Sequence, residues 1–278
     1  MSLKTTLVVA ASTAILLHHF KLDTKLAHAL TTQAPMLAQQ HKPAGQLTRA
    51  SYQTAKSANF AQCPQFFYRG IAPAIAEPGR LKPSALCYDA FAVYHSGLTR
   101  TPIYVAQHLT PASLTDAQDE VRTNRFFADA RLPSAERAEL DDYKGSGYDR
   151  GHLAPAGDMP TARAMAQSFS LANMVPQAPD NNRGIWAKSV EKAVRQYVQR
   201  TGSEVYVITG PVYTQGQSAD AAVKRVWVPD YLFKLVYDPA RQKSWAYWVA
   251  NRNDARMEKP ISYEELVERT GIAFLAQQ

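Results

Sequence analysis

The chain has few cysteines. Only Cys63 and Cys87 occur among its 278 residues, they form no CxxC pair, and no histidine cluster lies beside them, so the sequence disfavours a zinc site. In an exported protein this pair predicts one disulfide, which closes a loop of about 24 residues and contributes about 3 kcal/mol through loop entropy. In a cytoplasmic protein the same two residues would be buried free thiols.

Several signatures of enzyme classes are also missing. The sequence contains no GxGxxG, no P-loop and no internal repeat, which argues against a nucleotide-cofactor enzyme. It has no HExxH, and His95 and His108 stand alone, so a metalloprotease is disfavoured. It has no GxSxG, and Ser146 lies in GSG without a convincing triad order, so a serine hydrolase is disfavoured too.

Long apolar runs are absent as well. The uncharged stretch at residues 5–17 is shorter than the roughly 20 residues of a membrane-spanning helix but fits the core of a signal peptide. Residues 27–29 (AHA) offer a small-x-small cleavage pattern. We expect a signal peptide or uncleaved anchor at 1–29, a polar flexible arm at 30–61 and one globular domain at 62–278. The chain would then be periplasmic or secreted, with membrane contact only through its N-terminal segment.

What the chain does have is an excess of positive charge and enough apolar residues for a core. Lys and Arg outnumber Asp and Glu by 31 to 24, a net charge of +7, and 46% of residues are hydrophobic. The charge favours polyanionic partners such as nucleic acid or anionic lipid head groups. Strand patterns with β-branched and aromatic residues cover 91–94, 103–106, 204–209, 231–237 and 245–250. Helical patterns cover 161–168, 186–199 and 262–270, the last opened by a Ser262 cap. Without a regular βαβ repeat, this mixture predicts an α+β fold with a largely antiparallel sheet flanked by helices.

The segment SGYDRGHLAPAGDM at residues 146–159 places an acid, a cation and a histidine between glycines. Glycines let the backbone approach a bulky ligand closely. His152 has a side chain suited to general-base catalysis near pH 7, and Arg150 carries a planar cation that suits phosphate oxygens. The alternative is a surface turn in which Asp149 pairs with Arg150 while His152 only packs.

Asparagines gather in the next segment, SLANMVPQAPDNNRGIW, at residues 170–186. An amide oxygen is a hard, neutral ligand that Mg²⁺ accepts while it keeps most of its waters. Asn181 and Asn182 could equally cap the helix that follows. The two roles can coexist in neighbouring residues.

Four segments carry a resemblance to a known family: GSGYDRGHLAPAGDM, SLANMVPQAPDNNRGIW, VYVITGPVY and EELVERTGIAF. In this order and spacing, over about residues 86–274, they resemble the DNA/RNA non-specific endonucleases, which are endonuclease G-like nucleases with a ββα-metal (His-Me) finger. The resemblance implies that fold and a Mg²⁺-dependent enzyme that cleaves both DNA and RNA and leaves 5′-phosphate ends. It implies that His152 is the general base, that Asn182 is the single protein ligand of the metal, and that Arg150 helps to neutralise the phosphate.

Further site residues follow from the same resemblance. Arg122, with Arg125 as its rival, resembles the family's second phosphate-binding arginine, and Asn173 matches a position that supports the site. In the family a glutamate usually follows the tryptophan by four residues and holds a water at the metal. Here Val190 stands at that position and Glu191 comes one residue later. Because one residue turns an α-helix by about 100°, Glu191 can serve only if the helix contains a local insertion or bulge. Arg195 keeps the expected spacing from Glu191.

The chemistry of a phosphodiester agrees with this set. Its negative charge calls for cations, a deprotonated water and stabilisation of the departing 3′-oxygen, which a metal on Asn182 and a base at His152 would supply. No motif for reading bases is present, so we expect little sequence preference, and Lys144, Arg163, Arg183 and Lys188 are candidate contacts to the substrate. Mn²⁺ as a substitute metal, an inhibitor protein and a homodimer stay open. The alternative function is a catalytically inactive, nuclease-shaped protein that binds nucleic acid at the cell envelope.

Overall fold

The computed structural model describes residues 60–75, 78–214 and 222–275. The expected signal peptide or anchor and nearly all of the expected arm lie outside these ranges. No helix among the described residues is both long enough and apolar enough to cross a membrane. The described strands are β1 (Ala74–Ile75), β2 (Pro83–Cys87), β3 (Ala92–Ser96), β4 (Thr101–Leu109), β5 (Asp149–His152), β6 (Met174–Gln177), β7 (Val205–Val212), β8 (Ala222–Val223), β9 (Val226–Trp227), β10 (Tyr231–Asp238), β11 (Lys243–Ala250) and β12 (Ile272–Ala273).

The helices are short except for one. The described α-helices are α2 (Pro111–Asp116), α3 (Leu140–Tyr143), α4 (Ala162–Ser168), α5 (Lys192–Thr201) and α6 (Tyr263–Thr270), and a π-helix, η7 (Asn181–Glu191), runs directly into α5. Single 3₁₀ turns are η2 (Pro64–Phe66), η3 (Tyr68–Gly70), η4 (Pro78–Leu81), η5 (Ala156–Asp158) and η6 (Leu171–Asn173). Thr161 and Ser262 cap α4 and α6 through their hydroxyl oxygens, as the sequence predicts for Ser262.

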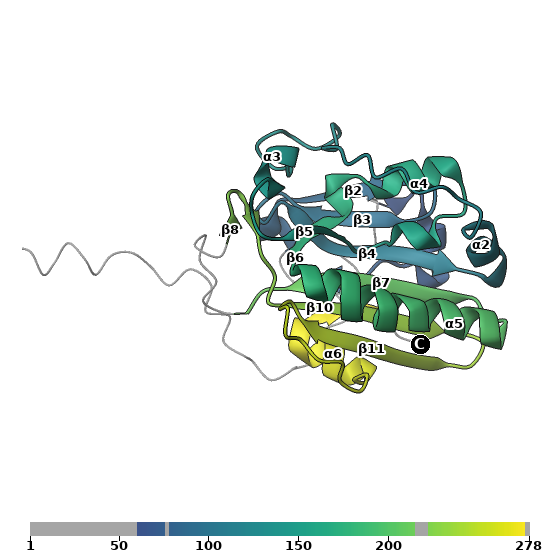
Figure 1. Cartoon of the computed structure of the whole chain (residues 1–278). Helices are drawn as coiled ribbons and strands as arrows, with labels where there is room; N and C mark the ends of the chain where they lie inside the picture. The colour runs from purple at the N-terminus through teal and green to yellow at the C-terminus, as the bar shows by residue number, and fades with distance from the viewer. Residues whose placement is uncertain (1–59, 76–77, 215–221, 276–278) are drawn as a thin grey trace, which may run out of the picture. The chain divides into compact units, whose positions relative to one another are not determined.

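A six-stranded antiparallel sheet forms the centre, with strand order β11-β10-β7-β4-β3-β2 (Figure 1). All five predicted strands belong to it, and the predicted α+β class with an antiparallel sheet is confirmed. β2 is not among the strands predicted from the sequence, because its segment begins with Pro83 and follows two further prolines, Pro73 and Pro78. Pro83 is tolerated because it begins an edge strand, where a missing backbone N–H removes no bond from the interior of the sheet.

Alternating side chains along β10 divide the core between two faces of the sheet. Leu232 and Val236 face the side covered by η7 and α5, and both are fully buried. Phe233 and Leu235 face the opposite side, where they pack with α6 and with the segment that begins at Phe60. Lys234 lies between Leu232 and Val236 and therefore points to the helix side.

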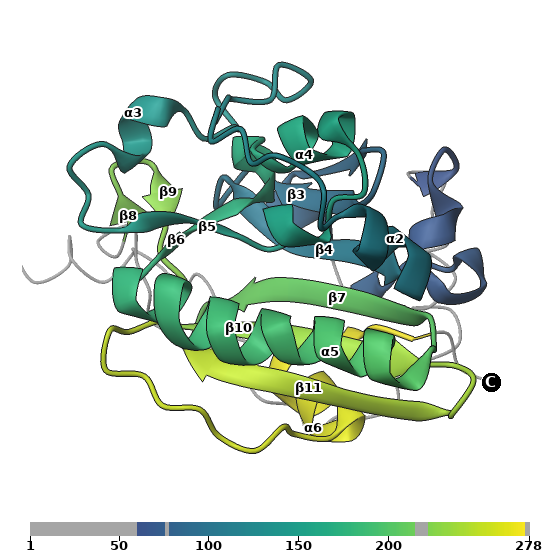
Figure 2. The ribbon, with the colours of Figure 1, turned by 45° about the vertical axis from the view of Figure 1, so that its right-hand side comes forward.

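The helix formed by η7 and α5 lies across one face of the sheet, in front of it in Figure 2. Its inward residues are Trp186, Val190, Val194 and Val198, each no more than 2% exposed. The helix ends at Gly202, which adopts a left-handed φ of 66° and donates its N–H to the carbonyl of Val198. This buried row holds the beginning of the helix, with its asparagines, in a fixed position.

The N-terminal segment of the described chain is tied to the opposite face. The predicted disulfide is present between Cys63 and Cys87, with the two Cα atoms 5.8 Å apart. Phe60 and Phe67 pack together with ring centroids 4.8 Å apart, and both are buried in the same cluster as Tyr104 of β4. The disulfide therefore joins edge strand β2 to a segment that already contributes to the core.

Candidate active site

The DRGH segment forms strand β5, not the surface turn that was the alternative interpretation. β5 pairs antiparallel with β6, so that Arg150 lies opposite Pro176 and His152 opposite Met174. Gly151 permits this pairing, because a Cβ there would lie 2.1 Å from Oε1 of Gln177. Together with the helix that begins at Asn181, β5 and β6 make the ββα unit that the resemblance implies.

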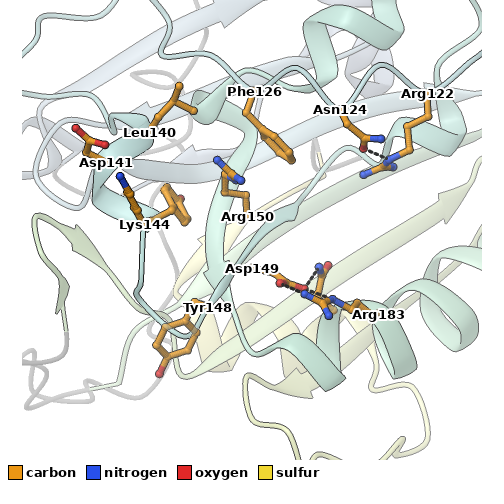
Figure 3. Close-up of a pocket in the computed structure, with 12 residues that line it drawn as sticks. Arg122, Asn124, Phe126, Leu140, Asp141, Lys144, Tyr148, Asp149, Arg150 and Arg183 are labelled. Atoms are coloured by element: carbon orange, nitrogen blue, oxygen red, sulfur yellow. Dashed lines mark hydrogen bonds and ion pairs between the residues drawn. The ribbon is translucent and has the colours of Figure 1, made fainter.

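A pocket of about 540 Å³ opens beside β5 (Figure 3). Its wall contains five residues predicted from the sequence to contact substrate or metal: Arg122, Lys144, Arg150, Asn182 and Arg183. The remaining lining residues are Asn124, Phe126, Leu140, Asp141, Tyr143, Tyr148 and Asp149. Four cationic side chains against two acidic ones make this wall suitable for an anionic ligand.

Asp149 fixes the orientation of the predicted metal ligand. Its Oδ2 accepts a hydrogen bond of 2.9 Å from Nδ2 of Asn182, and its two oxygens accept bonds of 2.8 and 2.6 Å from Arg183. Burial alone would raise the pKa of Asp149, but these bonds hold it below its ordinary value, so the group is a carboxylate. A carboxylate only accepts hydrogen bonds, so the amide nitrogen of Asn182 must face it and the amide oxygen is turned away. The proposed pairing of Asp149 with Arg150 is wrong, because Arg183 takes that place.

Asn181 and Asn182 do not cap the helix. Asp180 occupies the cap position, and no side chain makes a capping bond there. Asn181 instead accepts a bond of 2.7 Å from Gln177 and donates one of 2.6 Å to the carbonyl of Ala250. The two asparagines therefore have different positions: Asn181 joins the helix to β6 and β11, and Asn182 faces the pocket.

His152 lies in an aromatic cage beside the pocket and is not part of its wall. Its ring is 5.0 Å from that of Phe169 and 5.8 Å from that of Phe126, between ring centroids. The residue is 7% exposed, and its Nε2 is buried without a hydrogen-bond partner in the described chain. Burial, and then the charge of Arg122, lower the pKa of His152 to about 3. The imidazole is therefore neutral at pH 7 and able to accept a proton.

Arg122 connects the pocket with His152. Its guanidinium lies 5.0 Å from the centroid of the Phe169 ring, the same ring that contacts His152, and its Nε donates to Asn124 over 2.7 Å. Arg150 stacks over Phe126 at 4.2 Å, so both cations are positioned by aromatic faces. Arg125, the rival of Arg122, is exposed and lies outside the pocket wall.

Asn173 supports the strand that carries His152. It is fully buried, its Oδ1 accepts from the N–H of Ala154, and its Nδ2 donates to the carbonyls of Ala154 and Ser168, all over 2.9 Å. Three bonds of this kind fix the backbone two residues after His152. Asn173 therefore holds the backbone that follows His152, and it is not part of the pocket wall.

The π-helix accounts for the one-residue displacement of Glu191. In a π-helix each N–H bonds to the carbonyl five residues earlier, so residues five apart lie above one another as residues four apart do in an α-helix. The five-residue step from Trp186 to Glu191 falls within η7. Glu191 therefore lies on the side of the helix where an α-helix would place the residue after a four-residue step. The insertion that the sequence required for Glu191 is present.

Glu191 belongs to a buried group of charges. Arg195 Nη1 lies 2.9 Å from Asp158 and 3.9 Å from Glu191, and Lys234 donates to the carbonyl of Leu153 and to the hydroxyl of Thr209. Burial raises the pKa of Glu191, opposed by the charge of Lys234. Burial likewise lowers the pKa of Lys234, opposed by Glu191. We call Asp158, Glu191, Arg195 and Lys234 the buried charge cluster.

Sequence reasoning did not identify Asp158 or Lys234. Lys234 is 1% exposed in the middle of the apolar strand YLFKLVY, and a lone charge in such a strand is the signal that could have found it. Asp158 lies in GDM at the end of the DRGH segment. Phe126 was also missed, although it contacts both His152 and Arg150.

The residues present fit a divalent metal with a single protein ligand. No group of three or more His, Cys, Asp or Glu side chains in the described ranges could enclose a metal ion. The amide oxygen of Asn182 is a hard donor at the pocket, and Asp149 fixes the orientation of that amide. At metal sites a carboxylate commonly hydrogen-bonds to the residue that binds the metal and holds it in position.

Several known proteins are similar to this chain in sequence, and a solved structure is similar to it in fold. Nuclease C1 of Cunninghamella echinulata var. echinulata is 35% identical over 170 residues, which is 57% of this chain and 67% of that protein. The mitochondrial nuclease EXOG of Mus musculus is 31% identical over 253 residues, 84% of this chain and 65% of that protein. The chain spans less than half of some other mitochondrial nucleases that it matches.

A solved structure titled as the EndoG/EndoGI complex, on the mechanism of EndoG inhibition, superposes with a TM-score of 0.60. It is 23% identical and covers 79% of this chain and 92% of that chain, so it supports the ββα-metal nuclease fold. The model of the family described as DNA/RNA non-specific endonuclease matches residues 72–278. With the ββα unit, the DRGH strand and the cationic pocket in place, this chain belongs to the DNA/RNA non-specific endonuclease family.

Proposed function

We propose that this protein is a metal-dependent endonuclease that hydrolyses phosphodiester bonds in both DNA and RNA. The observation that carries the proposal is a neutral, buried His152 with an unpartnered ring nitrogen, next to a cationic pocket in which Asp149 orients the amide of Asn182. Family membership supports the reaction class. The roles of individual residues are those that the resemblance implies, and the contacts described above support them.

Substrate would be held by its phosphates. Arg122, Arg150 and Lys144 offer donors in the pocket wall, and contacts to phosphate do not distinguish one base from another. Phe126 and Phe169 hold the two guanidinium groups in place, which reduces the side-chain entropy lost on binding. Because phosphates are common to DNA and RNA, we expect such a site to accept both polymers.

His152 would take the proton from the attacking water. Its low pKa keeps it unprotonated over the neutral range, and the positive charge of Arg122 nearby is balanced once a phosphate binds. The water oxygen forms a bond to phosphorus, the bond from phosphorus to the 3′-oxygen breaks, and the products carry a 5′-phosphate and a 3′-hydroxyl. General-base catalysis of this kind is worth about 10² to 10⁴-fold.

Asn182 would hold the metal, which we propose to be Mg²⁺ with Mn²⁺ as a substitute. When bound, the ion supplies Lewis-acid stabilisation of the phosphate and of the departing oxygen. Glu191 and Arg195, which lie on the same continuous helix as Asn182, would support the metal end of the site. Glu191 would accept hydrogen bonds from water there.

We also propose that the protein acts outside the cytoplasm. The disulfide between Cys63 and Cys87 is typical of an oxidising compartment. Fractionation of expressing cells, followed by immunodetection of the full chain, would test this. A chain found only in the cytoplasm, with Cys63 and Cys87 as free thiols, would contradict it.

The central experiment is digestion of plasmid DNA and of RNA by the full chain, in Mg²⁺ and in EDTA. We expect cleavage of both polymers in Mg²⁺, loss in EDTA, and a rate lower by about 10² to 10⁴-fold for His152→Ala. The variant should keep its unfolding midpoint and its binding of nucleic acid. If the parent leaves both polymers intact in Mg²⁺ and in Mn²⁺ but binds them, the inactive binding protein is the correct alternative.

A further inference from the structure

One row of exposed side chains runs along the whole helix formed by η7 and α5. Residues five apart in the π-helix and four apart in the α-helix lie above one another, which aligns positions 183, 188, 192, 196 and 200. These positions hold Arg183, Lys188, Lys192, Gln196 and Arg200, and all five are exposed. Four of the five therefore carry a positive charge, and we call them the cationic row.

The cationic row contains no acidic residue. Asp180 precedes the helix, and the only carboxylate within it, Glu191, faces the buried charge cluster, where its side chain is 11% exposed. Among the described residues, no carboxylate forms an ion pair with Lys188, Lys192 or Arg200. An ordinary solvated helix face mixes both signs, because like charges at this spacing repel one another. A face with charges of one sign is suited to a polyanionic partner.

The row begins at the pocket. Arg183 is part of the pocket wall and its guanidinium is bound to Asp149, yet 72% of its side chain is exposed. From there the helix continues away from β5 along the front of the molecule in Figure 2. The nine α-helical steps from Glu191 to Arg200 alone rise about 14 Å at 1.5 Å each, and the π-helical steps before them add to that length. The row is therefore long enough to pass several phosphates of one strand, which lie about 3.4 Å apart along the axis of a duplex.

We propose that the cationic row binds the phosphate backbone of the nucleic acid on one side of the scissile linkage. This inference rests on the proposed function for its substrate class. The cationic row would be a second contact surface for substrate. Only nucleic acid strands long enough to extend from the pocket to Lys188 and Lys192 would bind it. The enzyme should therefore favour long polymers over short oligonucleotides, and this preference should depend on salt.

The test compares a tetranucleotide and a 30-nucleotide single strand, each as DNA and as RNA. In the double variant Lys188→Gln and Lys192→Gln, we expect kcat/KM on the 30-mer to fall at least about fivefold at 0.1 M salt. The slope of log Kd against log salt should decrease by about 1.4, from two lost contacts at about 0.7 each for single strands. Cleavage of the tetranucleotide should stay within twofold of the parent.

The control is the double variant Arg69→Gln and Lys82→Gln, which removes the same charge from exposed positions outside the helix, where Lys82 pairs with Glu136. It should leave both substrates and the salt slope unchanged. An equal loss on both lengths, an equal loss in the control, or an unchanged salt slope in the helix variant would overturn the inference.

Binding of the 30-mer in EDTA, followed by fluorescence anisotropy, separates this inference from the proposed function. A parent chain that binds through the row but cleaves nothing in Mg²⁺ would overturn the proposed function and leave the row intact. A parent that cleaves both polymers while the helix variant binds the 30-mer equally well would do the reverse.

Discussion

The two charged groups on the helix formed by η7 and α5 differ in their access to water. At its beginning, Asp149 joins Asn182 and Arg183 at the pocket, and Arg183 is 72% exposed. In its middle, the buried charge cluster is enclosed between the helix and the sheet, with side-chain exposures of 5% for Asp158 and 29% for Arg195. Water screens the first group and hardly reaches the second. The first can therefore exchange partners when a ligand arrives, whereas the second must remain paired.

The largest effect is expected for Lys234→Met. The substitution leaves two carboxylates, Glu191 and Asp158, against a single remaining cation in a region of low dielectric, so the free energy of unfolding should fall by about 3–5 kcal/mol. Urea unfolding at pH 7 measures it. Adding Glu191→Gln to this variant should restore part of the loss. A decrease of less than about 1 kcal/mol in the free energy of unfolding would show that the buried charge cluster contributes no more than a surface ion pair.

Next in size is the effect of the pocket group on metal use. Asn182→Ala removes the proposed ligand, and Asp149→Leu removes the carboxylate that orients it, so both should raise the metal concentration for half-maximal activity by about 10 to 100-fold. Titration with Mg²⁺, together with calorimetric binding of Mn²⁺, provides the measurement. Asn181→Ala serves as a control for the helix start, because Asn181 bonds to Gln177 and the Ala250 carbonyl and not to the pocket. An unchanged titration in Asn182→Ala would remove it from the proposed metal site.

The charge of Arg122 acts on the pKa of His152 beside the pocket and on that of Glu191 in the buried charge cluster. Its loss should give a smaller, pH-dependent effect on activity. Burial and the charge of Arg122 lower the pKa of His152 to about 3, so loss of that charge should raise the pKa toward its ordinary value. In Arg122→Gln the acid limb of kcat/KM should therefore move to higher pH, because His152 then binds its proton more easily. The parent should keep full activity from pH 7 down to about 5. An acid limb that moves to lower pH in the variant would contradict this arrangement.

The smallest effect is expected for Arg183→Gln, which breaks an exposed pair. The free energy of unfolding at pH 7 should hardly change, because water screens the exposed guanidinium. The pKa of Asp149 is held below its ordinary value by Arg183 and Asn182, so the pair stabilises the fold above the ordinary Asp pKa and this contribution disappears as pH falls through the folded-state value. Unfolding midpoints between pH 7 and pH 2 should therefore converge for parent and variant at the acid end. Divergence toward low pH would reverse the sign assigned here.

The sequence was sufficient for features that depend on neighbours along the chain. The five predicted strands and the Ser262 cap follow from local patterns, and the DRGH and Asn182 segments were recognisable by motif. It was insufficient where the partner comes from a distant strand. Nothing next to Lys234 in the sequence indicates Leu153 or Thr209. Lys234 reaches Thr209 because β10 pairs with β7, and it bonds to the carbonyl of Leu153, the residue that follows β5. Gly151 and Gln177 show the same limit, since their close approach is set by strand pairing.

The wide turns of η7 have a consequence for comparing this chain with its relatives. The five-residue step from Trp186 to Glu191 lies within the π-helix, and Val190 is buried in the core. If Glu191 has the proposed role, a comparison that counts residues as in an α-helix would assign that role to Val190. Removing Ser189 should convert the segment to ordinary helical winding while every later position keeps its orientation.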